Sequence, residues 1–360
     1  MSRFLNSRYR DLEPYTPGEQ PQDQKYLKLN TNESPFPPAQ TAQKNAAEAA
    51  KSLNLYSDPD CRVLSDALAE RLSADSGVKL TSENLIITNG SDEVLNFAFM
   101  AFCDADHPAV FPDVTYGFYP VFCQLSGIPY REIPLKADFS IDPEDYCRAR
   151  GTVFIANPNA PTGMLLPVEA IEGILASDPD RVVVVDEAYI DFGGVSCIPL
   201  IKKYPNLLVT RTFSKSRSMA GARLGFAVGC EALIGDLNTL RYSTNPYNVN
   251  SLTLALGLGT VLEESYTQRN CAEIIRVREL TAERLKALGF RMTDSKANFL
   301  FARSDRIPGG ELYRRLKERG VLVRHFDKPR IDDYNRITIG TEAQMDALVE
   351  AIKAILEERT

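Results

Sequence analysis

The sequence has little of what a metal centre, a zinc site or a disulfide framework requires. It contains only two histidines, His107 and His325, so a histidine-rich metal centre is not expected. Its seven cysteines are odd in number and scattered, and no two of them form a CxxC motif, which makes a zinc site or a disulfide framework improbable. This cysteine usage fits a reducing cytoplasm, which is where we expect the protein to be located.

Long apolar runs and an excess of basic charge are also missing. The first residues, MSRFLNSRYRDLEPY, have no apolar core of the kind a signal peptide needs, and no later run reaches the length of a membrane span. The formal net charge is −7, and no basic stripe interleaved with aromatic residues occurs. We therefore expect neither a membrane nor a nucleic acid as a partner.

What the chain does contain is a series of apolar runs that alternate with helical stretches. The runs LIIT, AVF, TVFIA, VVVVD, LLVT and LGFAVG begin at residues 85, 109, 152, 182, 207 and 224. Continuous apolar runs are typical of strands buried on both faces of a largely parallel α/β sheet. Each run ends in a polar cluster, and ligands of open α/β sheets bind outside the carboxyl ends of the strands. These clusters therefore form the candidate site.

The C-terminal part of the chain follows a different pattern. The segments NFLFAR, GELYRRLKERG, VLVRHF, RITIG and TEAQMDALVEAIKAILEE predict strand, helix, strand, strand and helix, the last one opened by a capping box of Thr341 and Gln344. With 360 residues, more than one domain is expected. We predict an N-terminal arm with part of a small domain over residues 1–40, a large domain over 41–265, and a small α+β domain over 266–360.

Three polar clusters at the predicted strand ends each allow more than one interpretation. NGSDE, residues 89–93, can be a turn with Ser91 or Asp92 as helix N-cap, or an anion site at the positive end of a helix. NPNAPTG, residues 157–163, can be a plain turn or part of a ligand site. Asp186 closes the VVVVD run, and a carboxylate there needs a salt bridge, a helix cap or a ligand as its partner.

The segment TFSKSRSMAGARLGFAVG, residues 212–229, carries the most specific cluster. Lys215 follows an apolar run, with the hydroxyls of Thr212 and Ser214 beside it and the guanidinium of Arg223 eight residues on, a set suited to phosphate. A lone lysine is usually a solvated surface residue. Here partial burial near Arg223 should lower the pKa of Lys215, which makes it a usable Schiff-base nucleophile. The aspartate at a neighbouring strand end strengthens the case for chemistry.

Taken in order, the motifs resemble those of the fold-type I pyridoxal 5′-phosphate (PLP) aminotransferases and, within them, the histidinol-phosphate aminotransferase family. The motifs are PYTPGEQP, LNTNESP, LYSDPD, TNGSDEVL, PDVTYGFY, NPNAPTG, VVVDEAYIDF, TFSKSRSMAGARLGFAVG, PYNVN, KANFLFAR, VLVRHF and RITIGT, and they span nearly the whole chain. The resemblance implies a large, mostly parallel α/β/α domain with a small α+β domain, a PLP cofactor and a homodimer.

The resemblance also implies the roles of the residues around the cofactor. Lys215 would hold PLP covalently and move a proton between substrate and cofactor, and Asp186 would keep the pyridine nitrogen protonated, as an electron sink requires. Tyr189 and Asn159 would hydrogen-bond the phenolic oxygen, and Tyr116 would stack on the ring. Tyr56 would reach the phosphate in the neighbouring subunit. The rest of the phosphate site would be Ser91, Asp92, Thr212, Ser214 and Arg223.

For the substrate, the resemblance implies two arginines and two residues of the N-terminal arm. Arg336 in RITIG would bind a carboxylate or phosphate, Arg324 in VLVRHF would add a second anion contact, and Tyr15 and Asn32 would close over the ligand. The implied reaction converts L-histidinol phosphate and 2-oxoglutarate to imidazole-acetol phosphate and L-glutamate, in histidine biosynthesis. The alternatives are an aromatic amino acid aminotransferase, a decarboxylase of the threonine-phosphate type and, least favoured, a non-catalytic regulator with an aminotransferase-like domain.

The sequence departs from the family pattern at two positions. Ala160 stands in NPNAPTG where many relatives have asparagine, and Arg217 stands in SKSRSMAG where others carry an aromatic residue. Arg217 could add another anion contact near the cofactor, but we expect it to lie at the surface.

Overall fold

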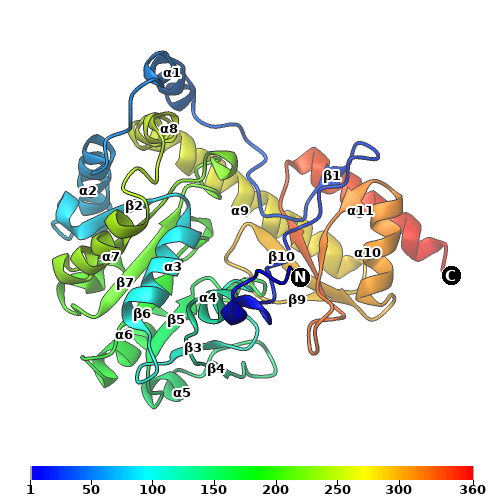
Figure 1. The fold of residues 1–360 in the computed structure, drawn as a ribbon. Helices are drawn as coiled ribbons and strands as arrows, with labels where there is room; N and C mark the ends of the chain where they lie inside the picture. The colour runs from blue at the N-terminus through cyan, green and yellow to red at the C-terminus, as the bar shows by residue number, and fades with distance from the viewer. Residues whose placement is uncertain (1, 360) are drawn as a thin grey trace.

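In the computed structural model, which describes residues 2–359, the predicted apolar runs pair into one seven-stranded sheet (Figure 1). Only β8 runs antiparallel to its neighbours, so the mostly parallel sheet is confirmed. The edge strand β4 was not predicted, because its first three residues are exposed and it has no apolar run. In spatial order the strands are β2 (Leu85–Thr88), β8 (Gly225–Gly229), β7 (Leu207–Thr212), β6 (Val183–Asp186), β5 (Thr152–Ala156), β3 (Ala109–Pro112) and β4 (Tyr130–Ile133).

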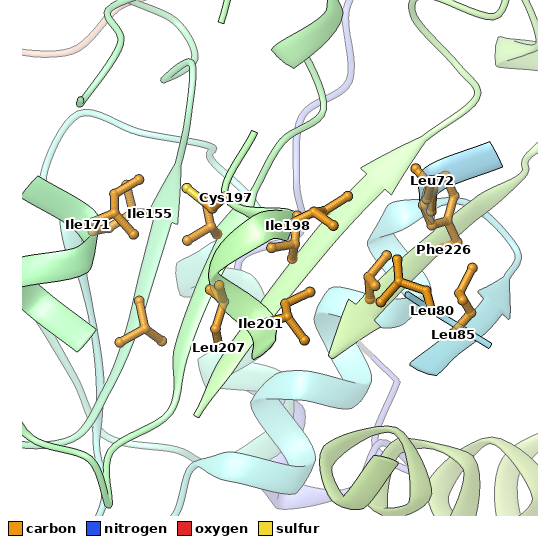
Figure 2. Packing of buried hydrophobic residues seen from close by; sticks show 14 of the residues in the cluster. Leu72, Leu80, Leu85, Ile155, Ile171, Cys197, Ile198, Ile201, Leu207 and Phe226 are labelled. Atoms are coloured by element: carbon orange, nitrogen blue, oxygen red, sulfur yellow. The ribbon is translucent and has the colours of Figure 1, made fainter. Parts of the chain in front are cut away.

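Alternate side chains of these strands enter two separate apolar clusters, one on each face of the sheet. On β5, Val153 and Ile155 belong to one cluster and Phe154 to the other. Figure 2 shows part of the first cluster, where Ile155 lies close to Ile171. Because both faces are covered, the strands are apolar throughout. The first face packs on α2 (Arg62–Ser76), α6 (Val168–Ser177) and η5 (Ile198–Lys202), and the second on α3 (Ser91–Phe102), α4 (Tyr119–Ser126) and α7 (Glu231–Thr244).

The C-terminal segments form a second, smaller sheet of antiparallel strands with its own apolar core. The capping box of Thr341 and Gln344 at the start of the last helix is confirmed. In spatial order the strands are β12 (Arg324–His325), β13 (Asn335–Thr338), β10 (Phe299–Ser304) and β9 (Phe290–Met292), and the helices of this unit are α10 (Gly309–Glu318) and α11 (Glu342–Glu357).

Two segments connect the small unit to the large one. The helix α9 (Glu264–Ala287) starts next to α8 (Ser251–Leu262) and runs across to the small sheet (Figure 1). The N-terminal arm contributes β1 (Leu27–Lys28), which pairs in parallel with β11 (Val321–Leu322). The domain limits at residues 40 and 265 stay a prediction.

The remaining elements are short or lie at the outer edge of the large unit. Within residues 2–359, no helix is long and apolar enough to cross a membrane. These elements are η1 (Ser7–Tyr9), α1 (Gln40–Ala49), η2 (Ala50–Ser52), η3 (Ser82–Asn84), α5 (Pro143–Cys147), η4 (Ile190–Phe192) and η6 (Ala220–Ala222).

Candidate active site

A pocket opens at the carboxyl ends of β5, β6 and β7, where the polar clusters predicted it. Many of the predicted cofactor residues line it together, whereas Asn159 and Tyr56 do not. Among residues 2–359, no group of histidine, cysteine and acidic side chains could hold a metal ion. The pocket is lined by Ser91, Asp92, Tyr116, Ala156, Pro158, Ala160, Asp186, Ala188, Tyr189, Thr212, Ser214, Lys215 and Arg223.

Lys215 follows β7 and directs its amine into the pocket. Its Nζ donates to the backbone oxygen of Thr31 at 3.2 Å and lies 5.8 Å from the centre of the Tyr189 ring. Burial, and then the positive charge of Arg336, lower the pKa of Lys215 to about 8. The predicted lowering is confirmed, although Arg336 contributes more than the expected Arg223. A large share of the amine is therefore neutral near pH 8 and able to act as a nucleophile or base.

Asp186 is the last residue of β6 and is only 5% exposed. Its carboxylate accepts hydrogen bonds from the Tyr119 hydroxyl at 3.2 Å, the Ala188 amide at 3.1 Å and the Thr210 hydroxyl at 3.4 Å. Burial raises its pKa to about 6. Among residues 2–359, no cation pairs with Asp186, so the salt bridge is not found. The helix that follows has Tyr189 as its N-cap, so Asp186 is not a helix cap either. Such a buried carboxylate requires a cationic ligand to remain ionised at low cost.

Tyr119 is a site residue that the sequence did not reveal. Its side chain is fully buried, at the first position of α4, and its hydroxyl is a donor to Asp186. The motif PDVTYGFY contains both Tyr116 and Tyr119. Only the sheet topology places Tyr119, which follows β3, next to Asp186 of β6, because β3 and β6 are separated by β5 alone.

The start of α3 forms a cradle for an anion. The N-cap is Gly90, with φ of 81° and no side chain to accept a hydrogen bond, so the prediction of Ser91 or Asp92 as N-cap was wrong. First-turn N–H groups of α3 are thus left for a ligand. The start of α3 packs closely against Gly225 of β8, and only glycine permits this contact, because a Cβ on residue 225 would lie 2.4 Å from the Ser91 nitrogen.

Arg223 closes the other side of the cradle. Its guanidinium donates to the Ser214 hydroxyl at 3.2 Å and to the Asp92 carboxylate at 3.1 Å. The hydroxyl of Thr212 accepts from the Ser214 amide at 3.1 Å. A fork of N–H donors beside a helix N-terminus is the arrangement that a phosphate monoester requires.

These groups fit three parts of PLP: its phosphate, its pyridine nitrogen and its aldehyde. The cradle of Gly90, Ser91 and Arg223 suits its phosphate, the unpaired carboxylate of Asp186 suits a protonated pyridine nitrogen, and the amine of Lys215 suits its aldehyde. The residues present therefore fit the cofactor that the sequence motifs imply.

The tyrosines and the asparagine predicted to contact the cofactor differ in position. Tyr116 lines the pocket and donates to Asp92 at 2.7 Å. The Tyr189 hydroxyl accepts from Asn32 at 2.9 Å, which leaves its own proton available. Asn159 lies beneath the pocket wall, where its amide N–H groups bond to the Val114 oxygen at 2.9 Å and the Thr162 hydroxyl at 3.0 Å. Its contact with the phenolic oxygen stays a prediction and would require one of these bonds to be exchanged.

Two arginines face each other in the small sheet next to the pocket. In the β12–β13 register, Arg324 lies directly opposite Arg336. No ion pair with an acidic residue is found for either of them in residues 2–359, and the Nε of Arg336 has no hydrogen-bond partner. Burial lowers the pKa of Arg336. Since like charges directly opposite each other are unfavourable, an anion bound between the two guanidinium groups would relieve their repulsion.

The N-terminal arm lies across this region. Asn32 is buried, and its backbone N–H donates to the Thr338 hydroxyl at 2.9 Å. Arg324 donates to the backbone oxygens of Thr16 at 3.0 Å and Pro17 at 3.1 Å. The ring of Tyr15 stacks on Phe118 with 4.5 Å between the centroids. The structure thus brings Tyr15 and Asn32, which are both part of the arm, next to the pocket residues Tyr116 and Tyr189.

Tyr56 lies outside the pocket of its own chain. It is 83% exposed and stacks on Tyr247 at 4.5 Å. Its predicted contact with the phosphate of a neighbouring subunit stays a prediction.

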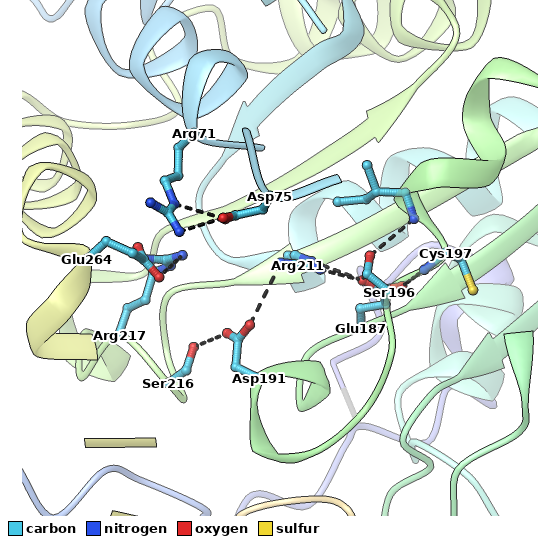
Figure 3. Close-up of polar contacts among 11 residues, drawn as sticks. Arg71, Asp75, Glu187, Asp191, Ser196, Cys197, Arg211, Ser216, Arg217 and Glu264 are labelled. Carbon is cyan, nitrogen blue, oxygen red and sulfur yellow. Dashed lines mark hydrogen bonds and ion pairs between the residues drawn. The ribbon is translucent and has the colours of Figure 1, made fainter. Parts of the chain in front are cut away.

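Arg217 is the one departure whose predicted position was wrong. Its side chain is 7% exposed rather than at the surface, and it forms an ion pair with Glu264 at 2.5 Å (Figure 3). The partner is 47 residues away in the sequence, so nothing local indicated it.

Comparison with known proteins shows the family to which the chain belongs. Residues 24–352 match the family model for aminotransferase class I and II. The chain is 46% identical to histidinol-phosphate aminotransferase 2 of Dechloromonas aromatica, over 99% of both chains. It is 45% identical to the histidinol-phosphate aminotransferase of Brachyspira hyodysenteriae, over 99% of this chain and 100% of that one. The crystal structure of a Sinorhizobium meliloti histidinol-phosphate aminotransferase with pyridoxal-5′-phosphate superposes with a TM-score of 0.82 at 22% identity, over 92% of this chain and 91% of that one.

Proposed function

Since the chain belongs to the class I and II aminotransferases, we propose that it is a histidinol-phosphate aminotransferase. The family depends on PLP, and the chain has its fold-type I architecture. The reaction is the transfer of the amino group of L-histidinol phosphate to 2-oxoglutarate, which gives imidazole-acetol phosphate and L-glutamate. It is a step of histidine biosynthesis and alternates between two half-reactions at one site.

Each role in the reaction follows from the surroundings of the side chain. When bound, PLP withdraws the electron pair that remains on the substrate's α-carbon after its proton leaves. Lys215, with its pKa lowered to about 8, would take that proton from the α-carbon and deliver it to C4′ of the cofactor, the carbon of its aldehyde. The buried carboxylate of Asp186 would hold the pyridine nitrogen in its protonated form. Tyr189, held by Asn32, donates the proton of its hydroxyl into the pocket.

The observation that carries the choice of substrate is the pair of arginines for which residues 2–359 provide no acidic partner. Arg324 and Arg336 supply two cationic groups to one anion-binding region. Histidinol phosphate has a phosphate and no carboxylate, whereas glutamate has two carboxylates, so a site with two forks serves both in turn.

We also propose a cytoplasmic homodimer with shared sites. Tyr56 and Tyr247 stack on each other at the surface, in a region with several other exposed apolar side chains. A second copy on this surface would bury them and bring Tyr56 to the phosphate cradle of the partner. The exposed apolar residues here include Leu53, Leu55, Tyr56, Val63, Tyr242, Tyr247 and Leu262.

The visible absorption spectrum of the purified protein tests this function. Addition of L-histidinol phosphate should remove the band of the lysine-bound cofactor, and 2-oxoglutarate should restore it. A band that L-histidinol phosphate leaves unchanged would overturn the substrate, and threonine phosphate and aromatic amino acids would be tried next. A protein that takes up no PLP would overturn the role of Lys215.

Arg336→Ala tests the shared anion site. We expect the half-reactions with both L-glutamate and L-histidinol phosphate to slow, because a charge-assisted contact is lost in each. Arg291→Ala is the matched control, since Arg291 lies in β9 of the same sheet and is 67% exposed in an ion pair with Asp305. If Arg336→Ala leaves both half-reactions intact, the assignment of Arg336 is wrong.

A further inference from the structure

The two residues that follow Lys215 lie outside the pocket lining and bind acids of two other elements (Figure 3). Ser216 donates to the Asp191 carboxylate at 2.5 Å. Arg217 forms two hydrogen bonds to the Glu264 carboxylate, at 2.5 Å and 3.4 Å. The backbone of Lys215 is therefore held from behind the pocket wall.

The two acids belong to elements that determine the site geometry. Asp191 lies in η4, two residues after Tyr189. Glu264 is the first residue of α9, and further along this helix Ile274 and Val277 are part of the apolar core of the small unit. That unit carries Arg324 and Arg336. The ion pair thus joins the loop of the reactive lysine to the helix on which the substrate-binding sheet packs.

The environment of the pair makes this connection rigid. The Arg217 side chain is 7% exposed, that of Glu264 is 15% exposed, and the guanidinium lies 5.3 Å from the centre of the Phe213 ring. A two-point contact between a planar guanidinium and a carboxylate fixes direction as well as distance. Burial limits the screening by solvent and salt, so a change in the position or charge of Glu264 changes the force on Arg217, and the reverse.

Several other charged groups surround the pair and the lysine. Asp191 and Cys271 lie close enough to Arg217 to affect its ionisation, and Arg211 lies 3.8 Å from Asp191. The groups that act on Lys215 itself are Arg336, Asp92, Glu33 and Arg223, on the pocket side. Arg217 and Glu264 compensate each other, so together they leave the field at Lys215 nearly unchanged.

We propose that Arg217 and Glu264 are a positioning pair that couples the orientation of α9, and with it the substrate-binding unit, to the placement of Lys215. The proposal rests on the transaminase function of Lys215. Neither residue contacts the reacting atoms, and their effect is on where the lysine amine stands when the substrate is bound.

The experiment uses the cofactor-loaded protein and four variants: Arg217→Met, Glu264→Gln, Arg217→Lys and the double variant Arg217→Met with Glu264→Met. The first measurement is the pH midpoint of the visible band, at which the lysine nitrogen titrates. Arg217→Met leaves a buried negative charge and should raise the midpoint, whereas Glu264→Gln leaves a positive charge and should lower it, each by about half a unit. The double variant should return to the wild-type midpoint, and Arg217→Lys should stay close to it.

The second measurement is steady-state kinetics with L-histidinol phosphate. The two single variants with a lost charge and the double variant should lower kcat about tenfold, with KM changed less than about twofold, because the lysine is misplaced while the anion site is intact. Arg217→Lys should recover part of kcat, since it keeps the charge but loses the fork. Lys286→Met is the control on α9, because Lys286 is 59% exposed in its ion pair with Glu283.

A purely structural pair would give a different result. Lower melting temperatures with wild-type midpoints and wild-type kcat in the folded variants would overturn the proposal. So would shifts of the same sign in both single variants, or a double variant with full kcat. The band titrates whether or not histidinol phosphate is the substrate, so failure of the proposed reaction in the wild-type protein is seen separately.

Discussion

Replacement of Asp186 by asparagine should stabilise the protein when no cofactor is bound, although it removes the carboxylate that the cofactor needs. The folded chain holds Asp186 with a pKa of about 6, against an ordinary value of 3.8. At pH values above 6, this pKa difference of roughly two units means that the ionised carboxylate destabilises the folded state by about 3 kcal/mol. Asparagine is of equal size, its amide oxygen can accept from the Ala188 amide and the Thr210 hydroxyl, and its NH2 group can donate to the Tyr119 hydroxyl oxygen, so most of that free energy should be recovered.

The pH dependence gives this prediction its sign. Between pH 3.8 and about 6 the folded protein binds the proton and the unfolded chain does not, so stability falls as the pH rises through this window. The advantage of Asp186→Asn should therefore be largest above pH 6, about half as large at pH 5, and absent below pH 4.

Urea denaturation of the cofactor-free protein, at fixed protein concentration and at pH 7.5, 5 and 4, measures the difference in the free energy of unfolding. The exposed Asp66 provides a control, since its replacement by asparagine should change stability by less than about 0.5 kcal/mol at every pH. With PLP present the order should reverse, because only the wild type gains stability from the ligand. A variant that is less stable than the wild type at pH 7.5 without cofactor, or a gain that does not depend on pH, would refute the reasoning.

Three other changes test further parts of the site. Lys215→Met should abolish the visible band and stabilise the cofactor-free protein by up to about 3 kcal/mol at pH 7, because the pKa of the amine is about 8 in the folded protein and 10.5 in the unfolded chain. This gain in the free energy of unfolding should disappear as the pH rises from 8 to 10.5. A gain that persists above pH 10.5 would contradict the assignment. Arg223→Gln should weaken PLP binding by about 10- to 100-fold in equilibrium dialysis, while Arg62→Gln, in an ion pair that is 73% exposed on the arginine side, should leave it unchanged. Gly225→Ala should lower both the melting temperature and the affinity for PLP, because the added Cβ would lie 2.4 Å from the Ser91 nitrogen. Gly221→Ala is the control, since a Cβ on Gly221 would meet none of the described residues within 4 Å. Equal behaviour of the two variants would refute the close approach at Gly225.

Local patterns identified the site residues that depend on strand ends. Lys215 and Asp186 each follow an apolar run, and a parallel sheet brings the ends of such runs to one edge whatever the order of the strands. That is why the pocket and the lowered pKa of Lys215 could be predicted from the chain alone. The family resemblance then supplied the roles that spacing does not contain, such as the anion site of Arg336.

Features that depend on distant partners could not be read in this way. Arg217 looked like a surface residue because its acid partner begins a helix in another part of the chain. Asn159 looked available for a ligand, whereas both of its donors are used within and beside its own turn. Ser91 and Asp92 are good N-cap residues by type, but the cap falls on Gly90, which has a φ of 81° and leaves no room for a Cβ beside the Arg223 guanidinium. Each of these outcomes is decided by a tertiary contact rather than by local preference.

The strand pairing also sets the order in which the protein can become competent during its synthesis. Leu85 of β2 pairs with Val228 of β8, and Leu27 of the arm pairs with Val321, so early segments must wait for late ones to leave the ribosome. Because such long-range pairing is slow, β2 exposes its edge to chaperones and to other chains for the time that this delay lasts. Capture of the cofactor must consequently wait at least until β8 has emerged, because Arg223 and the partner strand of β2 are made only then.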